Sequence, residues 1–181
     1  MENKYQKQYP DVMRGKKIMY VHGFASSAAS GSVTRMREML PSATVVAEDI
    51  PVDPHEGLAM LREMAARECP DLIVGTSMGG MYAEQLHGFD RILINPAFEI
   101  ASTMGAHGMT GRQQFLNPRK DGVGEFMVTK AMVREYRSVQ EGCFADTSEE
   151  EQQRVWGLFG DKDPLVHTFP LFSGRYRNAL W

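Results

Sequence analysis

Short runs of apolar residues recur along this chain of 181 residues, separated by stretches in which apolar residues return every three or four positions. Most of these runs are continuous rather than alternating with polar residues, which is typical of strands covered on both faces of a parallel sheet. We expect six such strands, at residues 16–23, 43–50, 71–77, 91–97, 154–161 and 176–181.

The stretches between the strands have the spacing of amphipathic helices. Residues 56–68, for example, place Leu58, Leu61 and Ala65 on one face. Regular alternation of strand and helix predicts an α/β fold with a doubly wound, mostly parallel sheet, in a single domain over residues 1–181. We expect helices at residues 34–40, 56–68, 78–87 and 128–141, and a turn with a short helix at 164–172.

Residues 98–127 interrupt this alternation. They contain five glycines and scattered charges, and no clear period is visible in them. A long irregular insertion in a compact domain is usually a functional lid or a mobile loop, so we expect a lid-like insertion here. The polar residues 1–15 are predicted to form a flexible N-terminal segment.

Composition argues against several classes of function. Charges of both signs are interspersed and the net charge is −3, so nothing indicates a nucleic-acid partner or a membrane surface. The polar N-terminus lacks the apolar core of a signal peptide, and no apolar run approaches the ~20 residues of a membrane span. We therefore predict a cytoplasmic protein. Cys69 and Cys143 match no metal-binding or redox spacing, and we expect ordinary thiols.

The segment GTSMGG, residues 75–80, fits the pattern G-x-S-x-G between an apolar strand and an amphipathic helix. A serine at such a sharp turn takes strained backbone angles, and Gly75 and Gly79 leave room for strand and helix backbones to approach each other. The turn lifts the hydroxyl of Ser77 above the carboxyl end of the sheet, next to a helix N-terminus. Ser77 is therefore our candidate nucleophile.

Two other interpretations of this segment are open. One is a glycine-rich turn in which the serine has no chemical role. The other is a phosphate-binding loop, which requires G-x-x-x-x-G-K-[ST], and no lysine follows Gly80.

The segment YVHGFASSAASGS, residues 20–32, follows the first strand and is rich in small residues. A tetrahedral intermediate needs two backbone N–H donors aimed at its oxygen, and a loop after an early strand is a usual source of one of them. We expect the N–H groups of Phe24 and Met78 to form this oxyanion hole. His22, with Gly23, is predicted to order the loop through hydrogen bonds. The alternative is an ordinary turn between strand and helix.

The segment GLFGDKDPLVH, residues 157–167, places two aspartates after a late strand. In the chain order Ser…Asp…His, the acid that orients the base occupies this position. Asp163 is our choice and Asp161 the second candidate, with a solvated turn as the alternative. A metal site is conceivable for D-x-D, but no further ligands stand nearby, so we predict neither a metal nor a cofactor.

Together, VHGF, GTSMGG and GDKDPLV resemble the α/β-hydrolase superfamily in order and spacing. The small size, and the NPA that follows RILI, are similar to the compact YqiA/YcfP-type bacterial esterases. The resemblance covers roughly residues 16–181. It implies a serine esterase or thioesterase that acts on small acyl esters or thioesters without a cofactor, with Ser77 as nucleophile, Asp163 as acid, and Phe24 and Met78 as oxyanion donors.

The general base departs from the family pattern, which places a histidine in a loop after the last strand. His167 lies only four residues after Asp163, so we expect the usual base in a segment after Trp181, with His167 as the candidate inside the chain. A degenerate hydrolase, or one that borrows its base from elsewhere, is the third possibility. The remaining histidines are better explained as surface or capping residues, namely His55, His87 and His107.

The hypothesis from the sequence is thus a serine hydrolase, an esterase or thioesterase that works through an acyl-enzyme. Its insertion at 98–127 would form a lid or an apolar wall for the acyl group, from Phe98, Ile100, Met104 and Met109, although core packing explains each of these residues equally well. Two rivals remain: a non-catalytic binding protein on the same scaffold, and an acyltransferase that passes the acyl group to an acceptor other than water.

Overall fold

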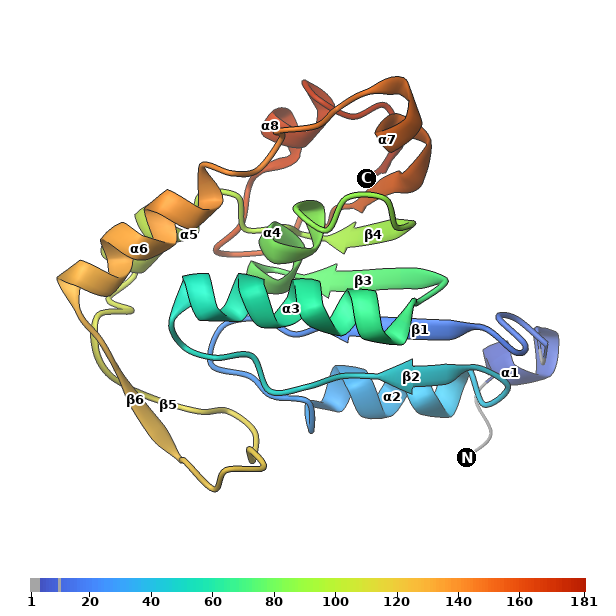
Figure 1. Ribbon diagram of the computed structural model, residues 1–181, viewed down its shortest axis with the longest axis horizontal. Coiled ribbons are helices and arrows are strands. Elements are labelled where there is room, and N and C mark those ends of the chain that lie inside the picture. The colour runs from blue at the N-terminus through green and yellow to red at the C-terminus, as the bar shows by residue number, and fades with distance from the viewer. Residues whose placement is uncertain (1–3, 10) are drawn as a thin grey trace.

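A six-stranded sheet forms the centre of the computed structural model, which describes residues 4–9 and 11–181 (Figure 1). The strand order is β2-β1-β3-β4-β7-β8, and every neighbouring pair is parallel. The predicted parallel sheet is therefore confirmed, with shorter strands than the sequence suggested. The strands are β1 Lys17–Val21, β2 Thr44–Val46, β3 Leu72–Thr76, β4 Arg91–Ile94, β7 Val155–Leu158 and β8 Ala179–Leu180.

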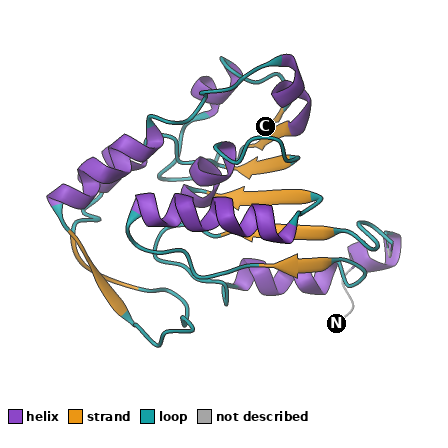
Figure 2. Cartoon of the chain, in the orientation of Figure 1, coloured by secondary structure: helices purple, strands orange, loops and turns teal. Residues whose placement is uncertain are grey.

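Helices cover the sheet on both faces (Figure 2). Val33 of α2 packs with Ile18 in one hydrophobic cluster, whereas Leu61 of α3 packs with Met19 in the cluster on the opposite face. The sheet is thus doubly wound, as predicted. The helices are α1 Lys4–Gln8, α2 Gly31–Met39, α3 Pro54–Glu68, α4 Met78–Glu84, α5 Ile100–Ala106, α6 Lys130–Gln140, α7 Glu149–Arg154 and α8 Phe169–Ser173.

The direction of winding reverses between β1 and β3. The chain leaves β1 toward α2 on one face of the sheet and leaves β3 toward α4 on the other (Figure 1). The loops at the carboxyl ends of these two neighbouring strands therefore diverge, and such a point is where open α/β sheets generally bind their ligands.

Two predicted helices begin earlier in the structure because capping side chains precede them. Ser30 accepts a hydrogen bond from the N–H of Val33, so the helix expected at 34–40 starts at Gly31. Asp53 caps the helix expected at 56–68, which starts at Pro54.

The helix expected at 78–87 ends at Glu84, and Gly88 lies beyond its end. Glu84 is fully buried and accepts hydrogen bonds from the Tyr176 hydroxyl, at 2.6 Å, and from the backbone N–H of Phe144, at 3.0 Å. The Arg91 guanidinium, also buried, donates to the Glu84 carbonyl and to Glu151. Arg91 is thus ion-paired with Glu151, as buried charges generally must be, whereas Glu84 is held through one of its two carboxylate oxygens by neutral donors. These contacts fasten the C-terminal third of the chain to the end of α4.

The insertion at 98–127 is more regular than the sequence indicated. It contains α5 and a hairpin in which β5, Gly111–Gln114, pairs antiparallel with β6, Glu125–Val128. From residue 112 to residue 119, exposed and half-buried side chains alternate strictly. The alternation was not visible in the sequence as alternating polar and apolar residues, because several of the half-buried residues are polar. They are Gln113, Asn117 and Arg119.

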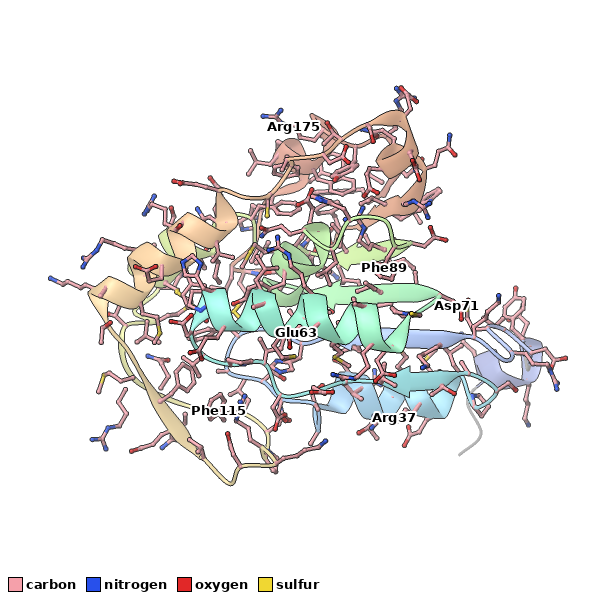
Figure 3. All side chains as sticks on the ribbon, in the orientation of Figure 1. Arg37, Glu63, Asp71, Phe89, Phe115 and Arg175 are labelled. Atoms are coloured by element: carbon pink, nitrogen blue, oxygen red, sulfur yellow. The ribbon has the colours of Figure 1, made fainter. Side chains whose placement is uncertain are left out.

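The hairpin lies beside the carboxyl ends of β1 and β3, and Figure 3 labels Phe115 on it. The predicted flexible segment 1–15 falls partly on residues 1–3 and 10, which lie outside the described residues. The rest of that segment includes α1. No helix in the described part of the chain is both long and apolar enough to cross a bilayer.

Candidate active site

Ser77 occupies a strained turn between β3 and α4. Its φ of 55° and ψ of −120° lie in a region that costs a side-chain-bearing residue on the order of 1–3 kcal/mol. Four backbone hydrogen bonds hold it there: its N–H donates to the Ile94 carbonyl at 3.0 Å, and its carbonyl accepts from the N–H groups of Gly80, Met81 and Ala97. The surrounding structure therefore determines this geometry, as the elbow interpretation of GTSMGG requires.

The glycines around Ser77 lie where no side chain fits. A Cβ on Gly79 would stand 2.0 Å from the carbonyl oxygen of Val21, and a Cβ on Gly75 would stand 2.4 Å from the carbonyl oxygen of Gly79. A Cβ on Gly80 would come within 2.8 Å of Pro96. Strands β1 and β3 and the start of α4 thus approach each other backbone to backbone.

Three polar groups at this turn have no partner among the described residues. The Ser77 hydroxyl, on a half-buried side chain, makes no hydrogen bond, and neither do the backbone N–H groups of Phe24 and Met78. Met78 is the first residue of α4, so its N–H is one of those that a helix leaves unsatisfied. The structure brings Phe24 and Met78 together at one pocket.

The loop after β1, residues 22–30, is the one expected to supply an oxyanion donor, and we call it the oxyanion loop for that expectation. His22 is buried there, and its Nε2 accepts a hydrogen bond from the N–H of Ile50 at 3.1 Å, while its Nδ1 lies 2.9 Å from the Gly23 carbonyl. Nδ1 must then carry the proton and donate it. Burial lowers the pKa of His22 below its usual 6.5, and the positive charge of Arg119 acts in the same direction. The ring is therefore neutral near pH 7.

Asp163 follows β7 and accepts three hydrogen bonds. Its Oδ1 accepts from the N–H groups of Leu165, at 2.9 Å, and Val166, at 3.0 Å. Its Oδ2 accepts from Nδ2 of Asn95 at 3.1 Å. Asp161, the second candidate, is exposed and makes no hydrogen bond within the described residues.

Asn95 was not singled out by the sequence analysis. It follows β4 with a φ of 41°, a conformation that asparagine tolerates better than most residues. Its Oδ1 accepts from the N–H of Gly160 at 2.9 Å, while its backbone N–H donates to the Leu158 carbonyl. Because the preceding residue, Ile94, accepts from the N–H of Ser77, the segment Ile94–Asn95 is hydrogen-bonded both to the Ser77 turn and to Asp163. The segment NPA, residues 95–97, after the fourth strand was the sequence signal that could have pointed to Asn95.

No histidine is hydrogen-bonded to Asp163 in the part of the chain that the structure describes. His167 is exposed between two buried neighbours, Val166 and Thr168, and makes no hydrogen bond there. His55 instead pairs with Glu135 at the surface, and His87 and His107 are exposed. The role of His167 as general base therefore stays a prediction.

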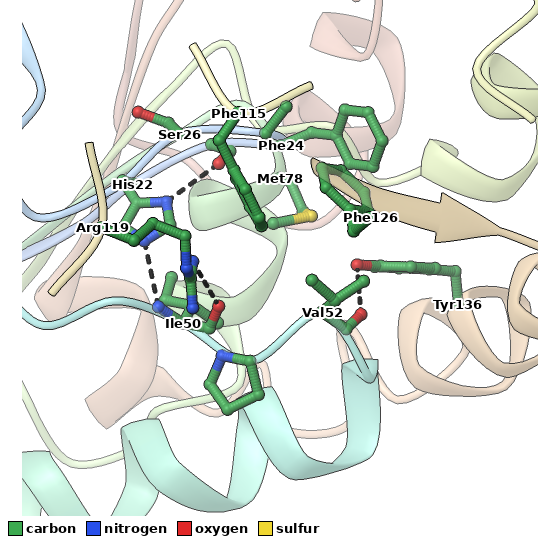
Figure 4. A pocket seen from close by; sticks show the side chains of 13 residues that line it. His22, Phe24, Ser26, Ile50, Val52, Met78, Phe115, Arg119, Phe126 and Tyr136 are labelled. Carbon is green, nitrogen blue, oxygen red and sulfur yellow. Dashed lines mark hydrogen bonds between the residues drawn. The ribbon is translucent and has the colours of Figure 1, made fainter. Parts of the chain in front are cut away.

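A small pocket lies between the loop after β1 and the hairpin, and Phe24 and Met78 both line it (Figure 4). Its apolar lining includes Phe24, Met78, Phe115 and Phe126, and the space left inside is about 10 Å³, roughly one water molecule. Of the two explanations for Phe98, Ile100, Met104 and Met109, an acyl wall and core packing, the structure supports core packing. The first three are buried in the main hydrophobic core and Met109 packs against it, because α5 packs on α6 instead of facing the elbow.

The described residues contain no group of three or more His, Cys, Asp or Glu side chains arranged to hold a metal ion. Cys69 and Cys143 are free thiols.

Comparison with known proteins gives a family and a fold. A model of the family described as "Uncharacterised protein family (UPF0227)" matches residues 17–167. Comparison with curated protein sequences found no significant match.

Several solved structures are similar to the chain. Est1E from Butyrivibrio proteoclasticus, bound to ferulic acid, has a TM-score of 0.53 and 15% identity over 93% of this chain and 78% of its own. Tomato methylketone synthase I, complexed with 2-tridecanone, has a TM-score of 0.56 and 12% identity over 91% and 88%. An esterase from a marine microorganism has a TM-score of 0.52 and 14% identity over 91% of this chain and 85% of its own. At these identities the likeness shows the fold, which is that of the α/β hydrolases.

Replacing Gly79 by alanine tests the close approach of α4 to β1. The new Cβ would stand 2.0 Å from the Val21 carbonyl oxygen, so backbone must move. We expect the free energy of unfolding to fall by about 3 kcal/mol or more, measured by chemical denaturation. Gly105→Ala is the control, because nothing lies within 4 Å of its added Cβ. Equal stability of the two variants would contradict the described turn.

Replacing His22 by glutamine tests its buried, neutral state. Because the folded state lowers its pKa below 6.5, the unfolded chain binds more protons as the pH drops below that value. The wild type should therefore lose free energy of unfolding below about pH 6.5, by up to ~1.4 kcal/mol per pH unit from this group. We expect His22→Gln to flatten this pH dependence, whereas the exposed control His107→Gln should not. Parallel curves for wild type and His22→Gln would refute the assignment.

Proposed function

This chain belongs to the family UPF0227 and has the fold of the α/β hydrolases, and from that premise we propose that it is a serine hydrolase that cleaves acyl esters or thioesters through an acyl-enzyme at Ser77. The observation that carries the proposal is the geometry of Ser77. Within the described residues the strained serine has an unbonded hydroxyl, and the N–H of Met78, the next residue, is unbonded too. The unbonded N–H of Phe24 follows Gly23, where an added Cβ would stand 3.5 Å from the Cβ of Ser77.

The proposed reaction uses these groups in order. The Ser77 hydroxyl attacks the carbonyl carbon of the ester as a general base takes its proton, and the N–H groups of Phe24 and Met78 stabilise the negative charge that develops on the carbonyl oxygen. The intermediate then collapses as the alcohol or thiol leaves with that proton. Water attacks the acyl-enzyme by the same route and releases the acid.

Asp163 is proposed to orient the base. It follows β7, and β7 runs parallel to β3, so both carboxyl ends lie at the same edge of the sheet. Its three hydrogen bonds fix the carboxylate at that edge.

The base itself has two candidate sources, His167 and a histidine after Trp181. The carboxyl end of β8 reaches the same edge of the sheet, because β8 is parallel to β7. Trp181 packs there against Phe159 and Phe169. A residue that followed Trp181 would therefore start from the side of the sheet where Ser77 lies.

A fluorophosphonate probe tests the proposal directly, because it phosphonylates an activated serine. We expect the folded protein to be labelled at Ser77, as mapped by mass spectrometry, and Ser77→Ala to lose the label. For turnover of an activated ester, we expect Ser77→Ala to lower kcat by on the order of 10⁴-fold. Ser138→Ala, at an exposed position of α6, is the matched control.

His167→Gln separates the two sources of the base. If His167 is the base, its replacement should slow labelling of Ser77 by about 10²-fold or more. An unchanged rate would place the base elsewhere. A folded wild-type protein that is not labelled would overturn the hydrolase proposal and favour a non-catalytic binding protein. A labelled protein that transfers acyl groups to an added amine or alcohol faster than to water would be an acyltransferase.

A further inference from the structure

The oxyanion loop contains a strained residue directly after Phe24. Ala25 has a φ of 56°, in the left-handed region that residues with a side chain rarely adopt. The following residues, SSAAS, are all small and supply little apolar surface of their own. The conformation that presents the N–H of Phe24 therefore needs support from outside the loop.

The loop's outside support comes largely from one turn, residues 115–120, which lies in the connection between the two strands of the hairpin. The backbone N–H of Leu116 donates to the carbonyl of the strained Ala25 at 2.7 Å. The Ser27 hydroxyl donates to the Pro118 carbonyl at 2.7 Å, and Nδ2 of Asn117 donates to the Ser26 hydroxyl at 3.2 Å. Three successive residues of the loop are thus bonded to three residues of this turn.

Asp49, after β2, joins the same two segments a second time. Its Oδ1 accepts from the N–H of Ala28 in the oxyanion loop at 2.9 Å, and its Oδ2 accepts from the N–H of Lys120 in the hairpin at 2.8 Å. Burial by itself would raise the pKa of Asp49, but these two hydrogen bonds and the nearby Arg119 outweigh it and lower the pKa. The carboxylate is therefore ionised near pH 7.

The side chain of Phe24 is held from the hairpin as well. Its ring meets the ring of Phe126 edge-on, with centroids 5.5 Å apart, and Phe126 in turn packs on Phe115 at 4.5 Å (Figure 4). Arg119 lies over the Phe115 ring at 4.5 Å, and its Nη1 donates to the Ile50 carbonyl at 3.2 Å. Both the backbone and the side chain around the Phe24 N–H thus depend on the hairpin.

We propose that the hairpin, residues 111–128, is a positioning element that completes the oxyanion hole when it closes on the oxyanion loop. This inference rests on the proposed function. The space of about 10 Å³ between Phe24, Met78 and the hairpin holds no more than a water molecule, so an acyl group that enters it must displace the hairpin. Its return restores the bond from Leu116 to Ala25 and with it the direction of the Phe24 N–H. The Leu116 N–H is the central positioning group.

A positioning element and a simple cover predict opposite effects on the reaction rate when the hairpin is loosened. Loosening a cover speeds entry of substrate, whereas loosening a positioning element slows the chemical step. Removing one oxyanion donor typically lowers kcat by about 10²–10³-fold, so a donor that is merely misplaced should have a smaller effect of the same sign.

Leu116→Pro removes the one backbone N–H that holds Ala25, and the side chain of Leu116 is 77% exposed, so little packing is lost. Leu116→Ala keeps the N–H and is the matched control. We expect Leu116→Pro to slow fluorophosphonate labelling of Ser77, and to lower kcat for a small activated ester, by about 10-fold or more with little change in KM. We expect Leu116→Ala to stay close to the wild type.

Ala25→Gly distinguishes an effect that passes through the strained loop from a general disturbance of the hairpin, which this substitution would not rescue. Glycine adopts a positive φ without strain, so the loop would need less support. We expect Leu116→Pro combined with Ala25→Gly to recover much of the lost rate. If Leu116→Pro does not fold, as judged by its thermal unfolding, Ser27→Ala takes its place, because it removes the bond to Pro118 without altering the backbone.

The outcomes separate this inference from the proposed function. A wild-type protein that is not labelled would overturn both the proposed function and this inference. A wild type labelled at Ser77, with Leu116→Pro or its substitute as fast or faster, would overturn this inference alone. A slow Leu116→Pro that Ala25→Gly does not rescue would also overturn it, because the loss would then not pass through the strained loop.

Discussion

The close approach of three backbone segments at Gly79 is the constraint on which the site depends. With no side chain at Gly75 or Gly79, β1, β3 and the start of α4 meet directly, and a Cβ on Gly79 would stand 2.0 Å from the Val21 carbonyl oxygen. Ser77 must then turn sharply, and its strain is held by four backbone hydrogen bonds. The same approach places the amino end of α4 against the oxyanion loop, where His22 and Gly23 follow β1.

The remaining parts of the site extend outward from this point along the edge of the sheet. Ile94 at the end of β4 and Ala97 after it bond to the backbone of Ser77, and Asn95 between them holds Asp163 in the loop after β7. On the other side, the hairpin and Asp49 hold the oxyanion loop. Each neighbouring strand therefore contributes one element, because all six strands are parallel and present their carboxyl ends together.

The parts predicted well from the sequence are those that follow from local pattern. Continuous apolar runs identified all six strands of the sheet, and glycine spacing identified the turn at Ser77 because only glycine permits such an approach. The hairpin was missed because its half-buried positions include the polar residues Gln113, Asn117 and Arg119. Asn117 and Arg119 make hydrogen bonds to residues far away in the sequence, Ser26 and Ile50. Asn95 and Asp49 were missed for the same reason, since their partners lie more than twenty residues away or on another strand's loop. The sequence left Phe98 between an acyl wall and the core, because apolar residues in an insertion serve either equally well.

The arrangement of Ser77 between two backbone donors is the central claim, and the structure of a covalent adduct tests it most directly. A crystal structure of the protein phosphonylated at Ser77 would show where the phosphoryl oxygen lies. We expect that oxygen within about 2.7–3.1 Å of the backbone nitrogens of both Phe24 and Met78. An adduct whose oxygen points to solvent, or to neither of these nitrogens, would contradict the account.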